Sequence, residues 1–159
     1  YAGIVTRYIV DPMLYKGHKF HLRVWVLAVV NEITGEKTFG YFTQSELVLA
    51  AEKYQKGDYD NLQIHDTHAK TASDVAIFPN DFPGDAAAVT ARMDKMFAEV
   101  GKRCLVNAKP PNKCRKGFLL AGADVLIDKN EYPWLLEVNG APGLLRTEGS
   151  QEFLNYRIL

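Results

Sequence analysis

The sequence predicts an α+β fold in which an antiparallel β-sheet carries helices on one side. Three observations lead to this prediction. Segments with strand-like alternation lie near both ends of the chain, one long segment has helical spacing, and a turn-rich stretch separates the first strands from that helix. With 159 residues, the chain has the length of a single domain or of one lobe of a larger one.

The composition excludes several classes of protein. Hydrophobic residues make up 47% and charged residues 24%, which excludes a disordered, collagen-like or coiled-coil chain. Lys and Arg number 19, as do Asp and Glu, so no net charge favours a nucleic-acid partner. The longest apolar run, residues 24–30, is much shorter than the roughly 20 residues that span a bilayer. Cys104 and Cys114 form no disulfide scaffold and no leader opens the chain, so we expect a soluble cytoplasmic protein.

The first strands are predicted from composition and alternation. Residues 3–10 have strand-like composition and begin without a cap, so this strand must pair with a later one or with residues preceding the chain. Residues 19–26 alternate strictly between polar and apolar side chains. Residues 37–42 follow a polar turn and predict the return strand of an antiparallel hairpin over residues 19–42.

The middle of the chain predicts little regular structure before one long helix. Residues 45–54 favour a short helix or an irregular turn, and residues 55–84 favour mostly loop. Asp85 is a suitable N-cap for a helix that continues to about Lys102. The apolar face of this helix consists of Val89, Met93, Met96, Phe97, Val100 and Cys104. A solvated loop over residues 107–116 follows it.

The last hairpin, strands 117–128 and 133–139, carries the first candidate site. A four-residue loop would pair Asp128 with Pro133, Leu126 with Leu135, Asp124 with Glu137 and Gly122 with Asn139. Asp124, Glu137 and Asn139 would then share one face, where their oxygens suit Mg²⁺. The alternative is an ordinary solvated acidic face. The opposite, core-facing side would consist of Val125, Ile127, Trp134, Leu136 and Val138.

Two further groups of residues are candidates for binding. Lys19, His21 and Arg23 share a face that is either an anion site, with Arg23 binding a carboxylate through both arms, or the solvated side of an edge hairpin. The segment from His65 to His68 has too few ligands for a zinc site, so its histidines are either surface residues or part of another site.

These segments together resemble the tubulin tyrosine ligase-like branch of the ATP-grasp fold. Residues 122–128 (GADVLID) and 134–142 (WLLEVNGAP) are similar to the paired motifs of that family. Tyr8 and Ile9 with Pro12 resemble its entry strand, and residues 19–23 (KFHLR) resemble its K-F-D-[IL]-R motif. The resemblance implies the C-terminal half of an ATP-grasp domain over residues 1–159.

The resemblance also implies roles for individual residues. Mg²⁺ would be held by Asp124, Glu137 and Asn139, and the adenine would lie against the backbone of Arg7, Tyr8 and Ile9. Lys19 would contact ATP and Arg23 would engage the acceptor or the amino acid. His21, His65 and Thr67 occupy positions of nucleotide or substrate contact, and three of the family's residues are replaced: an aspartate by His21, an arginine by Val48 and an asparagine by His68.

The function that this resemblance implies is an ATP- and Mg²⁺-dependent ligase. It would attach a free amino acid to tubulin or to another protein with an acidic tail, through an acyl phosphate, at microtubules or cilia. The phosphate-binding lysine and glycine-rich loop of the family's upstream half are not in this sequence, so we expect a piece of a larger protein. The alternative is a catalytically inactive ATP-grasp remnant that serves as a binding or structural module.

Overall fold

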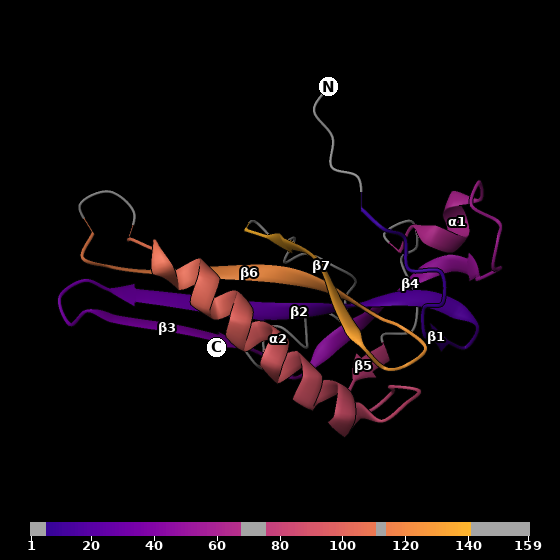
Figure 1. The fold of residues 1–159 in the computed structure, drawn as a ribbon, viewed down its shortest axis with the longest axis horizontal. Coiled ribbons are helices and arrows are strands. Elements are labelled where there is room, and N and C mark those ends of the chain that lie inside the picture. The colour runs from indigo at the N-terminus through magenta and orange to yellow at the C-terminus, as the bar shows by residue number, and fades with distance from the viewer. Residues whose placement is uncertain (1–5, 68–75, 111–113, 141–159) are drawn as a thin grey trace.

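The protein folds into a seven-stranded antiparallel sheet with one long helix across one face (Figure 1). The computed structural model describes residues 6–67, 76–110 and 114–140. The elements are β1 (Leu14–Tyr15), β2 (His18–Asn31), β3 (Glu36–Tyr41), β4 (Ser45–Lys53), α1 (Leu62–His65), β5 (Ala76–Phe78), α2 (Ala86–Val106), β6 (Lys116–Ile127) and β7 (Pro133–Asn139). The predicted α+β class is confirmed. Among the described residues, no helix has the length and apolar character needed to cross a bilayer.

Strand β2 is the centre of the sheet, whose strand order is β5-β4-β2-β6-β7. Its first half pairs with β4 and its second half with β3, while β6 lies along most of its other edge. The predicted hairpin between β2 and the return strand β3 is confirmed. The solvated-edge interpretation of Lys19, His21 and Arg23 is wrong, because β2 has neighbours on both sides and these three side chains are buried.

Helix α2 forms one wall of the core. Asp85 caps it as predicted, since its side chain accepts a hydrogen bond from the backbone N–H of Ala88 at 3.0 Å. The helix continues four residues beyond the predicted end and terminates at Asn107. Gly101 allows it to lie close to β3, because a Cβ at that position would be only 2.8 Å from the Phe39 ring.

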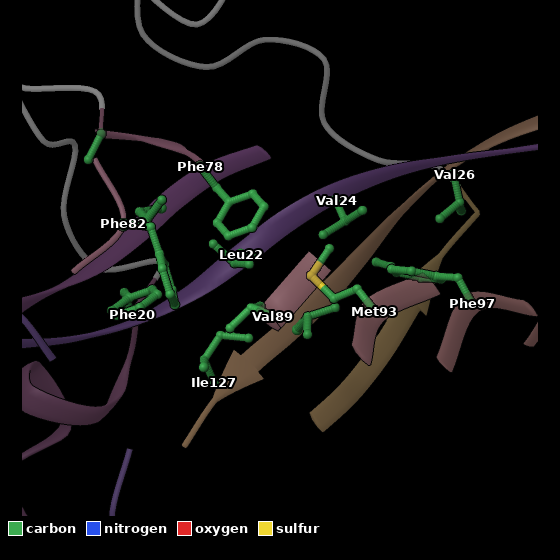
Figure 2. Close-up of a cluster of buried hydrophobic side chains, with 14 of the residues drawn as sticks. Phe20, Leu22, Val24, Val26, Phe78, Phe82, Val89, Met93, Phe97 and Ile127 are labelled. Atoms are coloured by element: carbon green, nitrogen blue, oxygen red, sulfur yellow. The ribbon is translucent and has the colours of Figure 1, made fainter. Parts of the chain in front are cut away.

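The core lies between α2 and the facing side of β2, β4 and β6 (Figure 2). Alternate residues of β2, from Phe20 to Val26, point toward the helix, as do the odd-numbered residues of β6 from Ala121 to Ile127. The side chains that the close-up labels are Phe20, Leu22, Val24, Val26, Phe78, Phe82, Val89, Met93, Phe97 and Ile127. The predicted apolar face of α2 is confirmed at Val89, Met93 and Phe97, which are buried. Cys104, which was predicted to lie on the same face, is exposed.

Two predicted elements are wrong. Residues 45–53 form strand β4 rather than a short helix or turn, because β4 pairs with β2 on one side and β5 on the other. Such pairing overrides the helix-favouring Ala and Leu of this segment. Residues 6–9 do not belong to a strand, and the chain first meets the sheet through a bridge between Pro12 and Asp128. Residues 3–5 of that predicted strand lie outside the described residues.

The final hairpin, β6 and β7, has the predicted register near the candidate site, although its turn differs from the predicted one. Asp124 pairs with Glu137 and Gly122 with Asn139, as predicted. The turn is one residue longer than assumed, however, so Ile127 pairs with Pro133 and Leu126 with Trp134. A bulge opposite Asp124 and Val125 adds one residue to β7 and restores the predicted pairing beyond it.

The longer turn moves Trp134 to the other side of the sheet. It pairs with Leu126, which lies on the same face as Asp124, the face of the sheet that points away from α2. Trp134 is 45% exposed, and Leu136 and Val138 are exposed as well, so the prediction that these three residues are core is wrong. Val125 and Ile127 are buried against α2, as predicted.

Replacing Trp134 by alanine should therefore have a small effect on stability. The variant loses the packing of a half-exposed ring and the hydrogen bond from the indole Nε1 to the Asp128 carboxylate at 3.0 Å. We expect the free energy of unfolding to fall by about 1 kcal/mol, measured by urea denaturation. A loss of about 3 kcal/mol or more would mean that Trp134 is buried after all.

Candidate functional site

The face of the sheet opposite α2 carries a row of buried charged side chains. Lys19, His21 and Arg23 alternate along β2 and point to this face, and Asp124 joins them from β6. Lys19 is only 8% exposed and Asp124 only 3%. Charged groups are rarely buried to this extent without partners, so their contacts define the site.

Arg23 and Asp124 form a bidentate ion pair. They are directly opposed on β2 and β6, with Arg23 Nε donating to Asp124 Oδ1 at 2.5 Å and Nη2 donating to Oδ2 at 3.1 Å. Arg23 also lies opposite Glu46 on β4, a residue that the sequence analysis missed because it did not predict this strand. The arginine is thus flanked by a carboxylate-bearing residue on each neighbouring strand.

His21 connects Asp124 to the segment after α1. Its Nδ1 lies 2.7 Å from the Thr67 hydroxyl oxygen, and its Nε2 lies 3.4 Å from Asp124 Oδ1. Burial acts to raise the pKa of Asp124, but His21 and Arg23 outweigh it by hydrogen bonding and charge, so the pKa lies below its usual range. Thr67 is buried although it belongs to a predicted loop, and the His21 ring lies between it and Asp124.

Glu137 and Asn139 lie at the open side of this face, on edge strand β7. The Asn139 Nδ2 donates to Glu137 Oε1 at 2.8 Å, and this places the amide oxygen and the exposed carboxylate next to each other. Both are cross-strand from β6 residues of the site, Asp124 and Gly122.

The oxygens of Glu137 and Asn139 fit a hard cation that takes its other ligands from water or phosphate. The third predicted ligand, Asp124, has both carboxylate oxygens bonded to Arg23. Accordingly, the described part of the chain contains no cluster of three or more His, Cys, Asp or Glu arranged to hold a metal. The arrangement fits Mg²⁺ brought in with a phosphate rather than a metal site made by the protein alone.

Lys19 lies at the other end of the row, under an aromatic cluster. Its Nζ is 3.4 Å from the Tyr8 hydroxyl oxygen and 4.9 Å from the centre of the Tyr8 ring. Tyr8 in turn contacts His65, whose ring stacks on Tyr59 and meets Tyr54 edge-on. The family resemblance implied only a backbone role for Tyr8, whereas its side chain contacts both Lys19 and His65. The sequence feature that could have indicated this aromatic cluster is the presence of Tyr54 and Tyr59 within about ten residues of His65.

The remaining predicted residues surround this row. Arg7 is exposed and Ile9 half-buried, in the irregular segment that leads from Tyr8 toward β1. Val48 is buried directly opposite His21, so an apolar side chain fills the position of the family arginine. His68 lies outside the described residues.

Comparisons with known proteins identify the family. A model described as the tubulin-tyrosine ligase family matches residues 2–158. Among curated proteins, the chain is 28% identical to the "Probable tubulin polyglutamylase ttll-9" of Caenorhabditis elegans over 98% of this chain and 40% of that protein. It is 30% identical to "Tubulin glycylase 3E" of Tetrahymena thermophila over 89% of this chain and 12% of that protein.

Other relatives differ in their described activity. The human "Inactive polyglycylase TTLL10" is 25% identical over 90% of this chain and 24% of that protein. The chain spans less than half the length of each of these relatives.

The fold has a solved counterpart. The C-terminal domain of K. lactis Pby1, described as an ATP-grasp enzyme that interacts with the mRNA decapping enzyme Dcp2, superposes with a TM-score of 0.67. The sequences are 21% identical, over 93% of this chain and 42% of that one. The chain therefore has the fold of part of an ATP-grasp domain, and by the match over nearly its whole sequence it belongs to the tubulin-tyrosine ligase family.

Proposed function

We propose that this chain is the C-terminal catalytic part of an ATP- and Mg²⁺-dependent ligase that attaches an amino acid to the acidic tail of a protein, with tubulin as the first candidate. The observation that carries the proposal is a single face of the sheet with two buried cations, Lys19 and Arg23, at one side and two oxygen-bearing side chains, the exposed Glu137 and the partly buried Asn139, at the other. Cations and metal-binding oxygens on one face suit a polyphosphate and a carboxylate substrate. The tubulin-modifying relatives support the substrate class.

The residues would divide the work by their chemistry. Lys19 presents an ammonium group to phosphate oxygens, and Arg23 presents a planar fork that matches a carboxylate. Glu137 and Asn139 would hold Mg²⁺, which neutralises phosphate charge when it is bound. The segment from Arg7 to Ile9 would meet the adenine.

The reaction would proceed in two displacements. A substrate carboxylate oxygen attacks the terminal phosphorus of ATP and ADP leaves. The amine of the second substrate would then attack the acyl carbon, the bond to phosphate would break, and the proton lost by the amine would leave with the phosphate as the amide forms. The protein contributes mainly position and charge to both steps.

A specific observation favours a second candidate, a binding module without catalysis. The carboxylate of Asp124 already occupies the fork of Arg23, in the arrangement that a substrate carboxylate would need. The family aspartate at position 21 is replaced by a histidine that also contacts Asp124. If this ion pair persists when nucleotide binds, neither residue is available to substrate or metal.

Binding of Mg-ATP to the Glu137→Gln variant tests the site. The substitution keeps the shape of the side chain and removes its charge, so we expect the full-length protein to bind Mg-ATP at least about tenfold more weakly in calorimetry. Glu36→Gln, at an exposed position on β3, is the matched control and should bind like wild type. Equal binding by wild type and Glu137→Gln would contradict the proposed metal site.

Incorporation of labelled amino acid into tubulin then separates the two candidates. Labelled tyrosine, glutamate and glycine should each be offered to the full-length protein with Mg-ATP, because the chain does not identify the donor. ATP-dependent labelling supports the ligase. Binding of Mg-ATP with no labelling of tubulin or of another acidic-tailed protein supports the module.

A further inference from the structure

A directed chain of hydrogen bonds leads from Lys19 through Tyr8 to His65. The Lys19 Nζ lies 3.4 Å from the Tyr8 hydroxyl oxygen, and that oxygen lies 2.8 Å from His65 Nδ1. At the far side of the ring, His65 Nε2 lies 2.6 Å from the backbone carbonyl oxygen of Asp58. The proposed ligase uses Lys19, but nothing so far assigns a role to the Tyr8 side chain.

The carbonyl of Asp58 determines the direction of the whole chain. A carbonyl oxygen can only accept, so the proton of a neutral His65 ring must be on Nε2. Nδ1 is then an acceptor, and the Tyr8 hydroxyl, which also has a hydrogen bond with Tyr54, is the donor that lies 2.8 Å from it. The Tyr8 oxygen can then accept a hydrogen bond from the Lys19 ammonium, which can only donate.

Lys19 needs such an acceptor because of where it lies. Desolvation lowers the pKa of this lysine, since burial disfavours its charged form. Within the described residues, no carboxylate bonds to Lys19, and its contacts are the oxygen and the ring face of Tyr8. Within the described residues, Tyr8 therefore supplies both of the contacts that hold the Lys19 ammonium in one place.

The cluster around His65 holds this arrangement in place. Tyr59 stacks on the His65 ring at 6.2 Å between centroids, while Tyr54 meets it edge-on at 6.1 Å. Tyr59 also meets the Tyr8 ring edge-on at 5.7 Å. A ring enclosed in this way cannot rotate without breaking several contacts, so His65 presents a fixed acceptor to Tyr8.

We propose that the Tyr8 side chain is a positioning residue that holds the Lys19 ammonium in place for an anionic ligand, and that His65 orients Tyr8 by accepting its hydroxyl proton. The proposal rests on the proposed function only in taking that ligand to be a nucleotide phosphate. The positioning of Lys19 by Tyr8 is a property of the protein without any ligand.

The first test measures the pKa of Lys19 in the ligand-free full-length protein. NMR titration of the lysine ¹³Cε resonances gives this pKa, with Lys19→Arg used to assign the signal. Tyr8→Phe keeps the ring face and removes the acceptor, so we expect the pKa of Lys19 to fall by about half a unit to one unit. Tyr59→Phe makes the same chemical change in the same cluster without a described hydrogen bond to Lys19, and it should leave the pKa unchanged. An unchanged pKa in Tyr8→Phe would overturn the proposal.

The second test concerns His65 and uses a rescue. His65→Ala removes the acceptor for Tyr8 and should lower the pKa of Lys19 in the same direction. His65→Asn places an amide oxygen near the position of Nδ1, so it should restore the wild-type value. If His65→Ala leaves the pKa of Lys19 unchanged, or if both variants lower it equally, His65 does not orient Tyr8 and that part of the proposal is wrong.

Affinity for Mg-ATP separates this proposal from the proposed function. If both hold, Tyr8→Phe should bind Mg-ATP about fivefold more weakly than Tyr59→Phe. If the pKa of Lys19 shifts while neither wild type nor variant binds nucleotide, Tyr8 positions Lys19 but the proposed function fails. If nucleotide binds equally to both variants and the pKa of Lys19 does not move, the proposed function survives and the positioning role is wrong.

Discussion

Asp124→Asn and Arg23→Met are each expected to lower the free energy of unfolding by about 3–5 kcal/mol. The two side chains form a buried, two-pronged ion pair between adjacent strands, and each substitution leaves the other charge buried without its main partner. Urea denaturation at pH 7 measures the loss. The exposed pair of Arg103 and Glu99 on α2 is the matched control, and Arg103→Met should cost no more than about 0.5 kcal/mol.

A double variant distinguishes the charge effect from packing. Replacing both partners, as Arg23→Met with Asp124→Asn, removes both buried charges, so the double variant should lose clearly less stability than the sum of the two single losses. Losses that simply add would show that the two side chains do not depend on each other.

The same ion pair predicts how the effect of Asp124→Asn varies with pH. The pKa of Asp124 is lowered in the folded protein, so its contribution is fully present above the unfolded-state pKa of about 3.9. This contribution disappears as the pH falls through the lower folded-state pKa. The stability difference between wild type and Asp124→Asn should therefore be constant near neutral pH and shrink below about pH 4. A difference that grows on acidification would contradict the assigned ion pair.

Phe97→Ala should produce a comparable loss, about 3–5 kcal/mol. Phe97 is buried on α2 among the clustered side chains of Figure 2, and it stacks on the Tyr41 ring of β3 at 4.6 Å between centroids. Its removal leaves a cavity between helix and sheet, where the close contact of Gly101 with Phe39 limits how far the two can move together. The measurement is again the denaturant midpoint, with the half-exposed Trp134→Ala as the comparison. Equal losses in the two variants would contradict the assignment of the core to the α2 face.

Local patterns determined the elements that depend on neighbours in sequence. The capped helix after Asp85 and the β2–β3 hairpin were predicted, because N-caps, alternation and short turns act within a few residues. The pairing of Asp124 with Glu137 was also predicted, but it arises because a bulge in β7 compensates for a turn that is one residue longer than assumed. The family's motifs led to the fold that the comparisons confirm. The roles of Glu137 and Asn139 as metal ligands and of Lys19 with ATP stay predictions.

Pairing between distant segments decided the rest. Residues 45–53 became a strand because β2 and β5 offer hydrogen bonds on both sides, which no pattern within those residues reveals. Trp134 lies outside the core because the longer turn shifts its pairing by one residue, and a one-residue shift reverses the face of a strand residue. The bulge in β7 corrects this shift only from Glu137 onward. The ion pair of Arg23 with Asp124 joins residues 101 positions apart. The sequence by itself therefore determined that Lys19, His21 and Arg23 share one face of their strand. Only the tertiary structure decided that Asp124 lies beside them and which of these groups bond to one another, because a buried charge is stabilised by partners that are close in space rather than along the chain.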